Sequence, residues 1–172
     1  MTESGYERYI VRKPGIRGKG GRVEYPERVQ AQNEADTGPL LFFPPELKKE
    51  VSSGAEYGII SRDIMVGTGR PGTFGPHKHD FGELFLFLGT DPDDLSDLGA
   101  EAEFWLGEGE ELEKVVLNSP SSVYVPAGLA HFPLNWKNVR RPCIFVVVAC
   151  TSHEQIERME KPVPVPLDGR PV

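Results

Sequence analysis

Cysteine is scarce in this 172-residue chain, which contains only two. Cys143 and Cys150 are seven positions apart, a spacing typical of neither a zinc site nor a redox-active pair. Both lie in or beside an apolar segment of strand-forming residues, so we expect two reduced, buried thiols. The sequence therefore predicts neither a disulfide nor a thiolate-bound metal.

Long hydrophobic runs are also missing. No segment approaches the roughly 20 consecutive apolar residues that a membrane-spanning helix needs. The first residues, from Met1 to Arg8, lack the apolar core of a signal peptide. We therefore expect a cytoplasmic protein that does not engage a membrane.

Net positive charge is absent too, because 26 acidic residues outnumber 19 lysines and arginines. Ten of the acids lie between Asp91 and Glu113, with no lysine or arginine among them. The opposite block, from Arg8 to Arg22, holds six basic residues and no acid. Each block is either a solvated surface or one half of a pair that attract within the chain or across a dimer. A short basic block on an acidic chain argues against a nucleic-acid partner.

Helical periodicity is weak, whereas turn-forming residues are abundant. Nineteen glycines and 16 prolines suit many short strands joined by turns. No strand–helix–strand rhythm appears, which disfavours a parallel sheet, and the length suits one domain with a sizeable core. We predict an antiparallel, all-β domain with one or two short peripheral helices. The expected strands occupy 40–43, 56–66, 83–88, 102–106, 114–117, 122–125, the segment bearing His131, and 143–149.

Histidine and glutamate side chains gather in two segments that lie far apart in the sequence. In the first, His77 and His79 are two positions apart, so in a strand they point the same way and can bind one ion together. Glu83 keeps that face if the strand continues, or approaches from the next strand if the intervening residues form a tight turn. In the second segment, His131 can join this group only if the chain folds into a sheet or barrel.

The chemistry of these four side chains predicts a metal site. Three imidazoles and a carboxylate, without a thiolate, suit one divalent transition-metal ion per chain, whether Fe, Mn, Ni, Co or Zn. An ion that prefers six ligands would keep about two positions open for water, dioxygen or a substrate. Lys78 and Asp80 point away from the histidine face in a regular strand, so no catalytic acid or base is assigned beyond the metal centre.

The two segments resemble the paired motifs of the cupin superfamily, HxHxxxE and PxGxxHxxxN. Residues 75–88 and 126–135 carry every expected ligand type. Gly72 and Gly89 each stand one position closer to the first motif's ligands than is usual, and Pro120 replaces the glycine that opens the second motif. The resemblance covers roughly residues 57–150.

The resemblance implies a double-stranded β-helix, a jelly-roll barrel in which His77, His79, Glu83 and His131 bind one metal ion. It also implies a homodimer. Residues 1–56 would form an N-terminal arm with strands packing on the barrel, and residues 57–150 the barrel itself, with an acidic insertion at 90–113. Residues 151–172 would form a C-terminal helix and a proline-rich tail.

Three functions are compatible with such a site. The first is an enzyme acting on a small organic acid or phenolic compound, of the dioxygenase, isomerase or decarboxylase type. The second is a metal-dependent module that binds or senses a small molecule without turnover, and the third is a purely structural barrel. Because one fold supports many reactions, the resemblance does not choose among them. The candidate pocket residues are Arg62, Phe85, Trp105, Tyr124 and Asn135.

Two of these candidates have a competing interpretation. Arg62 lies on an apolar strand segment and could hold a substrate carboxylate by a two-pronged hydrogen bond, or form an ion pair at the rim. Asn135 lies four residues after His131, where support of the ligands is more plausible than metal binding.

Overall fold

The computed structural model describes residues 53–69 and 75–151, together with the backbone of four two-residue strands outside them. These are β1 (Ile16–Arg17), β2 (Val23–Glu24), β3 (Leu40–Leu41) and β13 (Lys161–Pro162). The predicted C-terminal helix lies outside the described residues, as do most of the predicted N-terminal arm and most of the basic block. Among the strands that the structure describes, β1 and β2 pair with each other.

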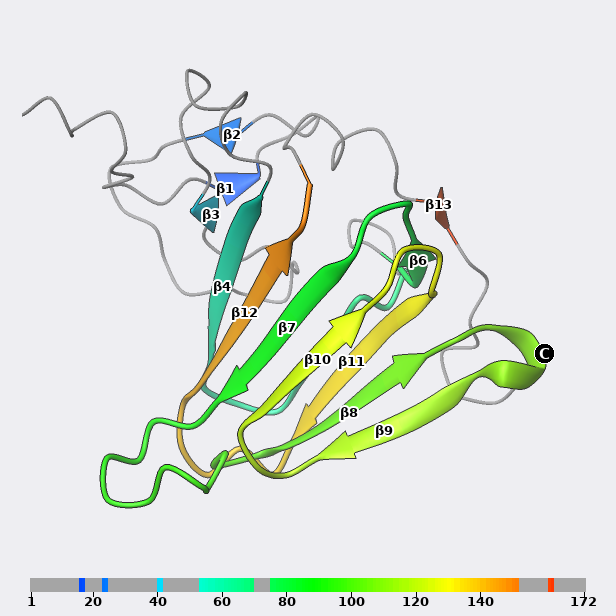
Figure 1. Ribbon diagram of the computed structural model, residues 1–172. Coiled ribbons are helices and arrows are strands. Elements are labelled where there is room, and N and C mark those ends of the chain that lie inside the picture. The colour runs from blue at the N-terminus through cyan, green and yellow to red at the C-terminus, as the bar shows by residue number, and fades with distance from the viewer. Residues whose placement is uncertain are drawn as a thin grey trace, which may run out of the picture.

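Two antiparallel sheets face each other across one hydrophobic core (Figure 1). The first sheet has the order β10-β7-β12-β4-β3, and the second has the order β13-β6-β11-β8-β9 with β5 also paired to β11. The first contains β4 (Gly54–Ile60), β7 (Glu83–Leu88), β10 (Ser121–Val125) and β12 (Cys143–Ala149). The second contains β5 (Ile64–Val66), β6 (His77–Lys78), β8 (Glu101–Leu106), β9 (Glu113–Leu117) and β11 (His131–Lys137). This arrangement confirms the predicted all-β jelly roll.

The expected long strand at 56–66 is instead two strands in different sheets. β4 pairs with β12 in the first sheet, whereas β5 pairs with β11 in the second. Between them Ser61, Arg62 and Asp63 are exposed, and the Asp63 carboxylate accepts a hydrogen bond from the Val139 amide at 2.9 Å. The chain thus crosses between the sheets at a polar corner, so no single strand face runs through the whole segment.

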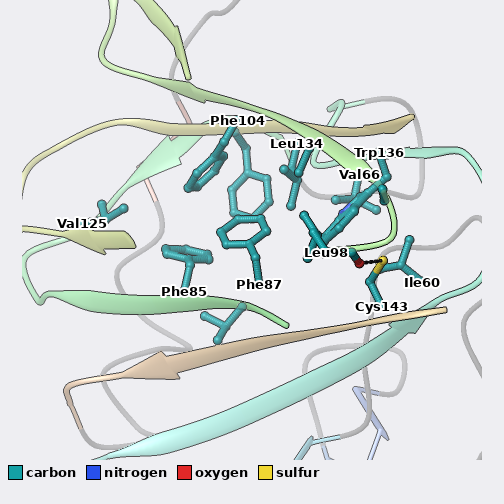
Figure 2. Close-up of a cluster of buried hydrophobic side chains, with 14 residues drawn as sticks. Ile60, Val66, Phe85, Phe87, Leu98, Phe104, Val125, Leu134, Trp136 and Cys143 are labelled. Atoms are coloured by element: carbon teal, nitrogen blue, oxygen red, sulfur yellow. Dashed lines mark hydrogen bonds between the residues drawn. The ribbon is translucent and has the colours of Figure 1, made fainter. Parts of the chain in front are cut away.

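Aromatic side chains fill the space between the sheets (Figure 2). Phe85 and Phe87 of β7, Phe104 of β8 and Trp136 of β11 are completely buried. The Phe87 ring centroid lies 5.5 Å from that of Trp136 and 6.1 Å from that of Phe104, both in tilted contacts. Tilted packing of this kind suits the quadrupoles of the rings and leaves a dense core.

The predicted acidic insertion at 90–113 is not a single loop, because it contains β8 and the start of β9. β8 lies between β11 and β9, with a short 3-10 turn (Gly109–Glu111) between β8 and β9. Only residues 89–100 form a long connection, and it ends with Leu98 completely buried in the core. The thiol of Cys143 donates a hydrogen bond to the Leu98 carbonyl at 3.1 Å (Figure 2).

Both cysteines are free thiols, as predicted, but only one of them is buried. Cys143 begins β12 and faces the core, whereas Cys150 follows the strand and is exposed. Because Ala149 faces inward, the alternation of side chains directs the next residue outward. None of the described residues forms a helix long and apolar enough to cross a membrane.

Candidate metal centre

The four predicted ligands lie together at one end of the barrel. His77 of β6 and His131 of β11 are direct partners across the second sheet. Glu83 is the first residue of β7 in the first sheet, and His79 lies in the connection between β6 and β7. Of the two placements that the sequence left open for Glu83, the structure shows the approach from the next strand.

These side chains are buried and their polar atoms converge. One nitrogen of each of His77, His79 and His131 lies within 4.8 Å of a nitrogen of the other two. The Glu83 Oε2 atom lies 3.2 Å from Nε2 of His79 and 3.2 Å from Nε2 of His131. Exposure of the four residues does not exceed 8%.

Each histidine is fixed through its other ring nitrogen. In every case Nδ1 faces a backbone carbonyl two residues away, which accepts a hydrogen bond when that nitrogen carries the proton. A neutral ring held in this way presents the lone pair of Nε2, the arrangement usual for metal-binding histidines. The bonds join His77 to Gly75 at 2.7 Å, His79 to Phe81 at 2.7 Å, and His131 to Leu129 at 3.1 Å.

The carboxylate of Glu83 remains ionised in this setting. Burial by itself raises its pKa, but hydrogen bonding and charge attraction from His131 and His79 outweigh burial and lower the pKa to about 2. This lowering requires a proton on Nε2 of each histidine; where Nδ1 carries the proton instead, a bound cation would supply the positive charge beside the carboxylate.

The donor set fits a divalent transition-metal ion. Lone pairs of buried nitrogen and carboxylate oxygen that point at one another are poorly stabilised unless a proton or a cation lies among them. Three imidazoles and one carboxylate, without a thiolate, match the ligand preferences of Fe, Mn, Ni, Co and Zn. His77, His79, Glu83 and His131 are thus suited to hold such an ion.

A glycine turn brings the two histidine segments together. The Gly128 amide donates a hydrogen bond to the His79 carbonyl at 2.7 Å, and the Leu129 amide bonds back to Pro126 at 3.2 Å. Gly128 has a φ of 85°, in the left-handed region that glycine adopts without strain. The proline and glycine of the second motif therefore form the turn that delivers His131 next to the first motif.

Of the five candidate pocket residues, the structure places Phe85 beside the metal centre. Its ring is fully buried, with its centroid 5.6 Å from that of His131. Arg62 is exposed at the corner between β4 and β5. Tyr124 is 63% exposed. Its ring packs on the backbone of Gly82, where an added Cβ would lie 2.7 Å from the phenol oxygen.

Asn135 and Trp105 lie on the outer face of the second sheet rather than in the barrel. The Asn135 amide donates a hydrogen bond to Glu103 at 3.0 Å, and Glu103 also pairs with Lys114 at 2.8 Å and Lys137 at 2.7 Å. Burial alone raises the pKa of Glu103, but these partners lower it to about 2. This group stabilises an outer face, and it does not reach the histidines.

Two further aromatic side chains, Phe81 and Phe132, contact the histidines. The Phe81 ring stacks on His79, with centroids 3.8 Å apart and planes inclined by 3°. The Phe132 ring stacks on His77, with centroids 5.7 Å apart and an inclination of 17°. Phe81 follows His79 by two positions and Phe132 follows His131 directly, which is the only trace of either contact in the sequence.

Solved structures share this architecture. CapF bound to the inhibitor 3-isopropenyl-tropolone matches with a TM-score of 0.52 and 13% identity, over 83% of this chain and 35% of CapF. Oxalate oxidase matches with a TM-score of 0.53 and 13% identity, over 90% of this chain and 65% of the enzyme. A protein from Klebsiella pneumoniae with a double-stranded β-helix domain has a lower TM-score of 0.45 and 15% identity, over 72% of this chain and 84% of that protein.

No protein-family model and no curated protein sequence matches the chain. The likeness to solved structures therefore establishes the fold, and the chain spans only 35% of CapF and 65% of the oxalate oxidase chain. Its two antiparallel sheets and its buried group of three histidines agree with that likeness. The protein has the cupin-type double-stranded β-helix fold.

Proposed function

We propose that this protein binds one divalent transition-metal ion through His77, His79, Glu83 and His131 and acts as an enzyme on a small organic acid or phenolic compound. The observation that carries the proposal is the convergence of buried Nε2 atoms on an ionised carboxylate, at 3.2 Å from both His79 and His131. A divalent ion bound there supplies Lewis acidity towards a carbonyl, carboxylate or phenolate oxygen.

The surroundings of the site favour a small ligand. Phe85 is completely buried and Phe132 is 5% exposed, and their ring centroids lie 5.6 and 5.3 Å from that of His131. These rings occupy the core side of the metal centre and exclude water from it, so a ligand would approach from the end of the barrel. Oxalate oxidase, by its name, acts on a small dicarboxylate, so this fold can serve such a substrate.

The reaction is best sought among the dioxygenase, isomerase and decarboxylase types. The test is elemental analysis of untagged protein purified without chelator, followed by oxygen uptake and product analysis with a panel of small acids and phenols. We expect about one metal ion per chain, and turnover of at least one compound. Protein that takes up no Fe, Mn, Ni, Co or Zn even after reconstitution would overturn the proposal.

The second candidate function is a metal-dependent binding or sensing module. It is favoured by the aromatic surroundings of the site, where the rings of Phe85 and Phe132 pack beside His131. Saturable binding of a compound to the metal-loaded protein, without oxygen uptake or product, would favour this module over the enzyme.

A cytoplasmic homodimer remains part of the proposal. The outer face of the first sheet supports a dimer, because Leu84 and Leu86 of β7 lie opposite Val148 and Val146 of β12 in an apolar stripe. Leu88, at the end of the same stripe, is 37% exposed. Sedimentation as a monomer at micromolar concentration would contradict the dimer.

A further inference from the structure

Phe132 lies at an irregularity in β11. His131 pairs with Leu106 and Leu134 pairs with Phe104, so three steps along β11 correspond to two steps along β8. In a regular strand, residues three apart face opposite sides of the sheet. Because of the extra residue, the ligand His131 and the core residue Leu134 both face inward and are both completely buried.

The backbone at this bulge is strained. Phe132 has a φ of 74°, a conformation that residues other than glycine rarely adopt. Such a conformation costs free energy and persists only where the surroundings hold it in place. Strained residues of this kind occur often at functional sites, which makes the contacts of Phe132 informative.

Those contacts join the bulge to two metal ligands. The Phe132 ring is stacked on His77 and its centroid lies 5.3 Å from that of His131. On another side the ring packs against Gly67, where a Cβ would lie 2.6 to 2.8 Å from Phe132 side-chain atoms. Only glycine permits this approach, so the position of the ring is set by the backbone of a separate segment.

We propose that Phe132 is a positioning residue that orients His77 and His131 to bind a divalent cation; the proposal rests on the proposed function. The hydrogen bond between Nδ1 and the Gly75 carbonyl holds one edge of the His77 ring, and the stacked face of Phe132 sets the plane of the ring. The backbone of the same residue turns His131 into the barrel. Pre-organised ligands of this kind bind metal more tightly because less ordering accompanies binding.

The test compares Phe132→Leu with Phe87→Leu. Both substitutions replace a buried ring in the core by an aliphatic side chain, but Phe87 contacts Phe104, Trp136 and Phe145. We expect Co²⁺ binding to the metal-free protein to weaken about tenfold in Phe132→Leu, with an altered visible spectrum of the Co²⁺ protein. Phe87→Leu should bind Co²⁺ as the wild type does.

A second pair of variants moves the ring without removing it. Gly67 and Gly69 both have a φ of 69°, so alanine is similarly strained at either position. At Gly69, however, a Cβ would meet its nearest neighbour at 3.5 Å, an ordinary contact distance. Gly67→Ala should therefore weaken Co²⁺ binding and change its spectrum, whereas Gly69→Ala should lose only the stability that the backbone strain costs and retain the wild-type affinity.

A measurement on the metal-free protein separates the possible failures. The ring current of Phe132 should shift the His77 imidazole protons upfield in NMR spectra, and Phe132→Leu should abolish that shift. If the wild type binds Co²⁺ but Phe132→Leu binds it equally well, the positioning role is overturned whether or not the shift changes. A wild type that binds neither Co²⁺ nor any of Fe, Mn, Ni and Zn overturns the proposed function, and the positioning role with it.

Discussion

The two ends of the barrel show opposite ways of arranging charge. One end, the histidine end, holds His77, His79, Glu83 and His131. The other, the loop end, consists of residues 89–100 together with Arg140 and Arg141. β7 runs from Glu83 at the first to Leu88 at the second, so the ends lie about 17 Å apart along this strand.

At the loop end, Asp91 and Asp97 pair with arginines of opposite charge. Asp97 accepts hydrogen bonds from the Gly99 amide at 2.9 Å, from Arg140 at 2.7 Å and from Arg141 at 2.6 Å. Arg141 also pairs with Asp91. These groups are partly open to solvent, and their contacts are complete within the chain.

At the histidine end the groups are buried and their acceptors face one another. The Glu83 carboxylate lies beside the Nε2 atoms of His79 and His131, whose Nδ1 atoms face backbone carbonyls. Under the proposed function a cation would complete this end, whereas the ion pairs of the loop end are closed within the chain. On that proposal the loop end serves folding and the histidine end serves ligand binding.

Removal of one metal-binding side chain at the histidine end should have the largest effect. His79→Ala should lower affinity for Zn²⁺ or Co²⁺ by more than about 100-fold, beyond the range expected for residues that merely support a ligand. Elemental analysis and calorimetric titration measure the change. Glu83→Ala should behave alike, and retention of metal by both variants would refute the assigned ligands.

A substitution in the core at the loop end should lower stability without changing metal binding. Leu98 is completely buried, so Leu98→Ala should lower the free energy of unfolding by about 2–5 kcal/mol and leave the metal content unchanged. Leu95, in the same loop, is 77% exposed, and Leu95→Ala should change stability by less than about 0.5 kcal/mol. Urea denaturation of both variants measures the difference. Loss of metal from folded Leu98→Ala would show that the two ends are coupled.

The histidine end was easier to predict from sequence than its surroundings. His77, His79, Glu83 and His131 could be chosen because their residue types, their spacing and the resemblance to the paired cupin motifs all indicated the same four side chains. Whether Glu83 shared a strand with the histidines depended on the pairing of β7 in the other sheet, which local sequence does not encode.

Predictions based on the alternation of side chains along a strand failed where the backbone departs from a regular strand. With a regular strand at 131–137, Asn135 would share the inward face of His131, but the bulge at Phe132 turns it outward to Glu103. In the same way, the unbroken segment at 56–66 gave no sign that it changes sheets at Arg62. Long-range pairing determines both features, and no local propensity marks either of them.

The smallest expected effect concerns pH at the loop end. The backbone amide of Gly99, followed by Arg141 and Arg140, lowers the pKa of Asp97 below its usual 3.8. A folded-state pKa below the unfolded value means that Asp97 stabilises the fold fully above about pH 4 and loses this contribution as the pH falls through the folded pKa. Asp97→Asn should therefore be less stable than the wild type at pH 7.

The two proteins should converge in stability as the pH is lowered towards 3, because protonation removes from the wild type the same charge that the substitution removes. Urea denaturation between pH 3 and 7 measures this difference. Asparagine keeps an acceptor for the Gly99 amide but places a donor towards Arg141, so the lost interactions are those with the two arginines. A stability difference that stays constant across this range would mean that packing, rather than charge, holds the loop end closed, and the contrast between the two ends would then not be electrostatic.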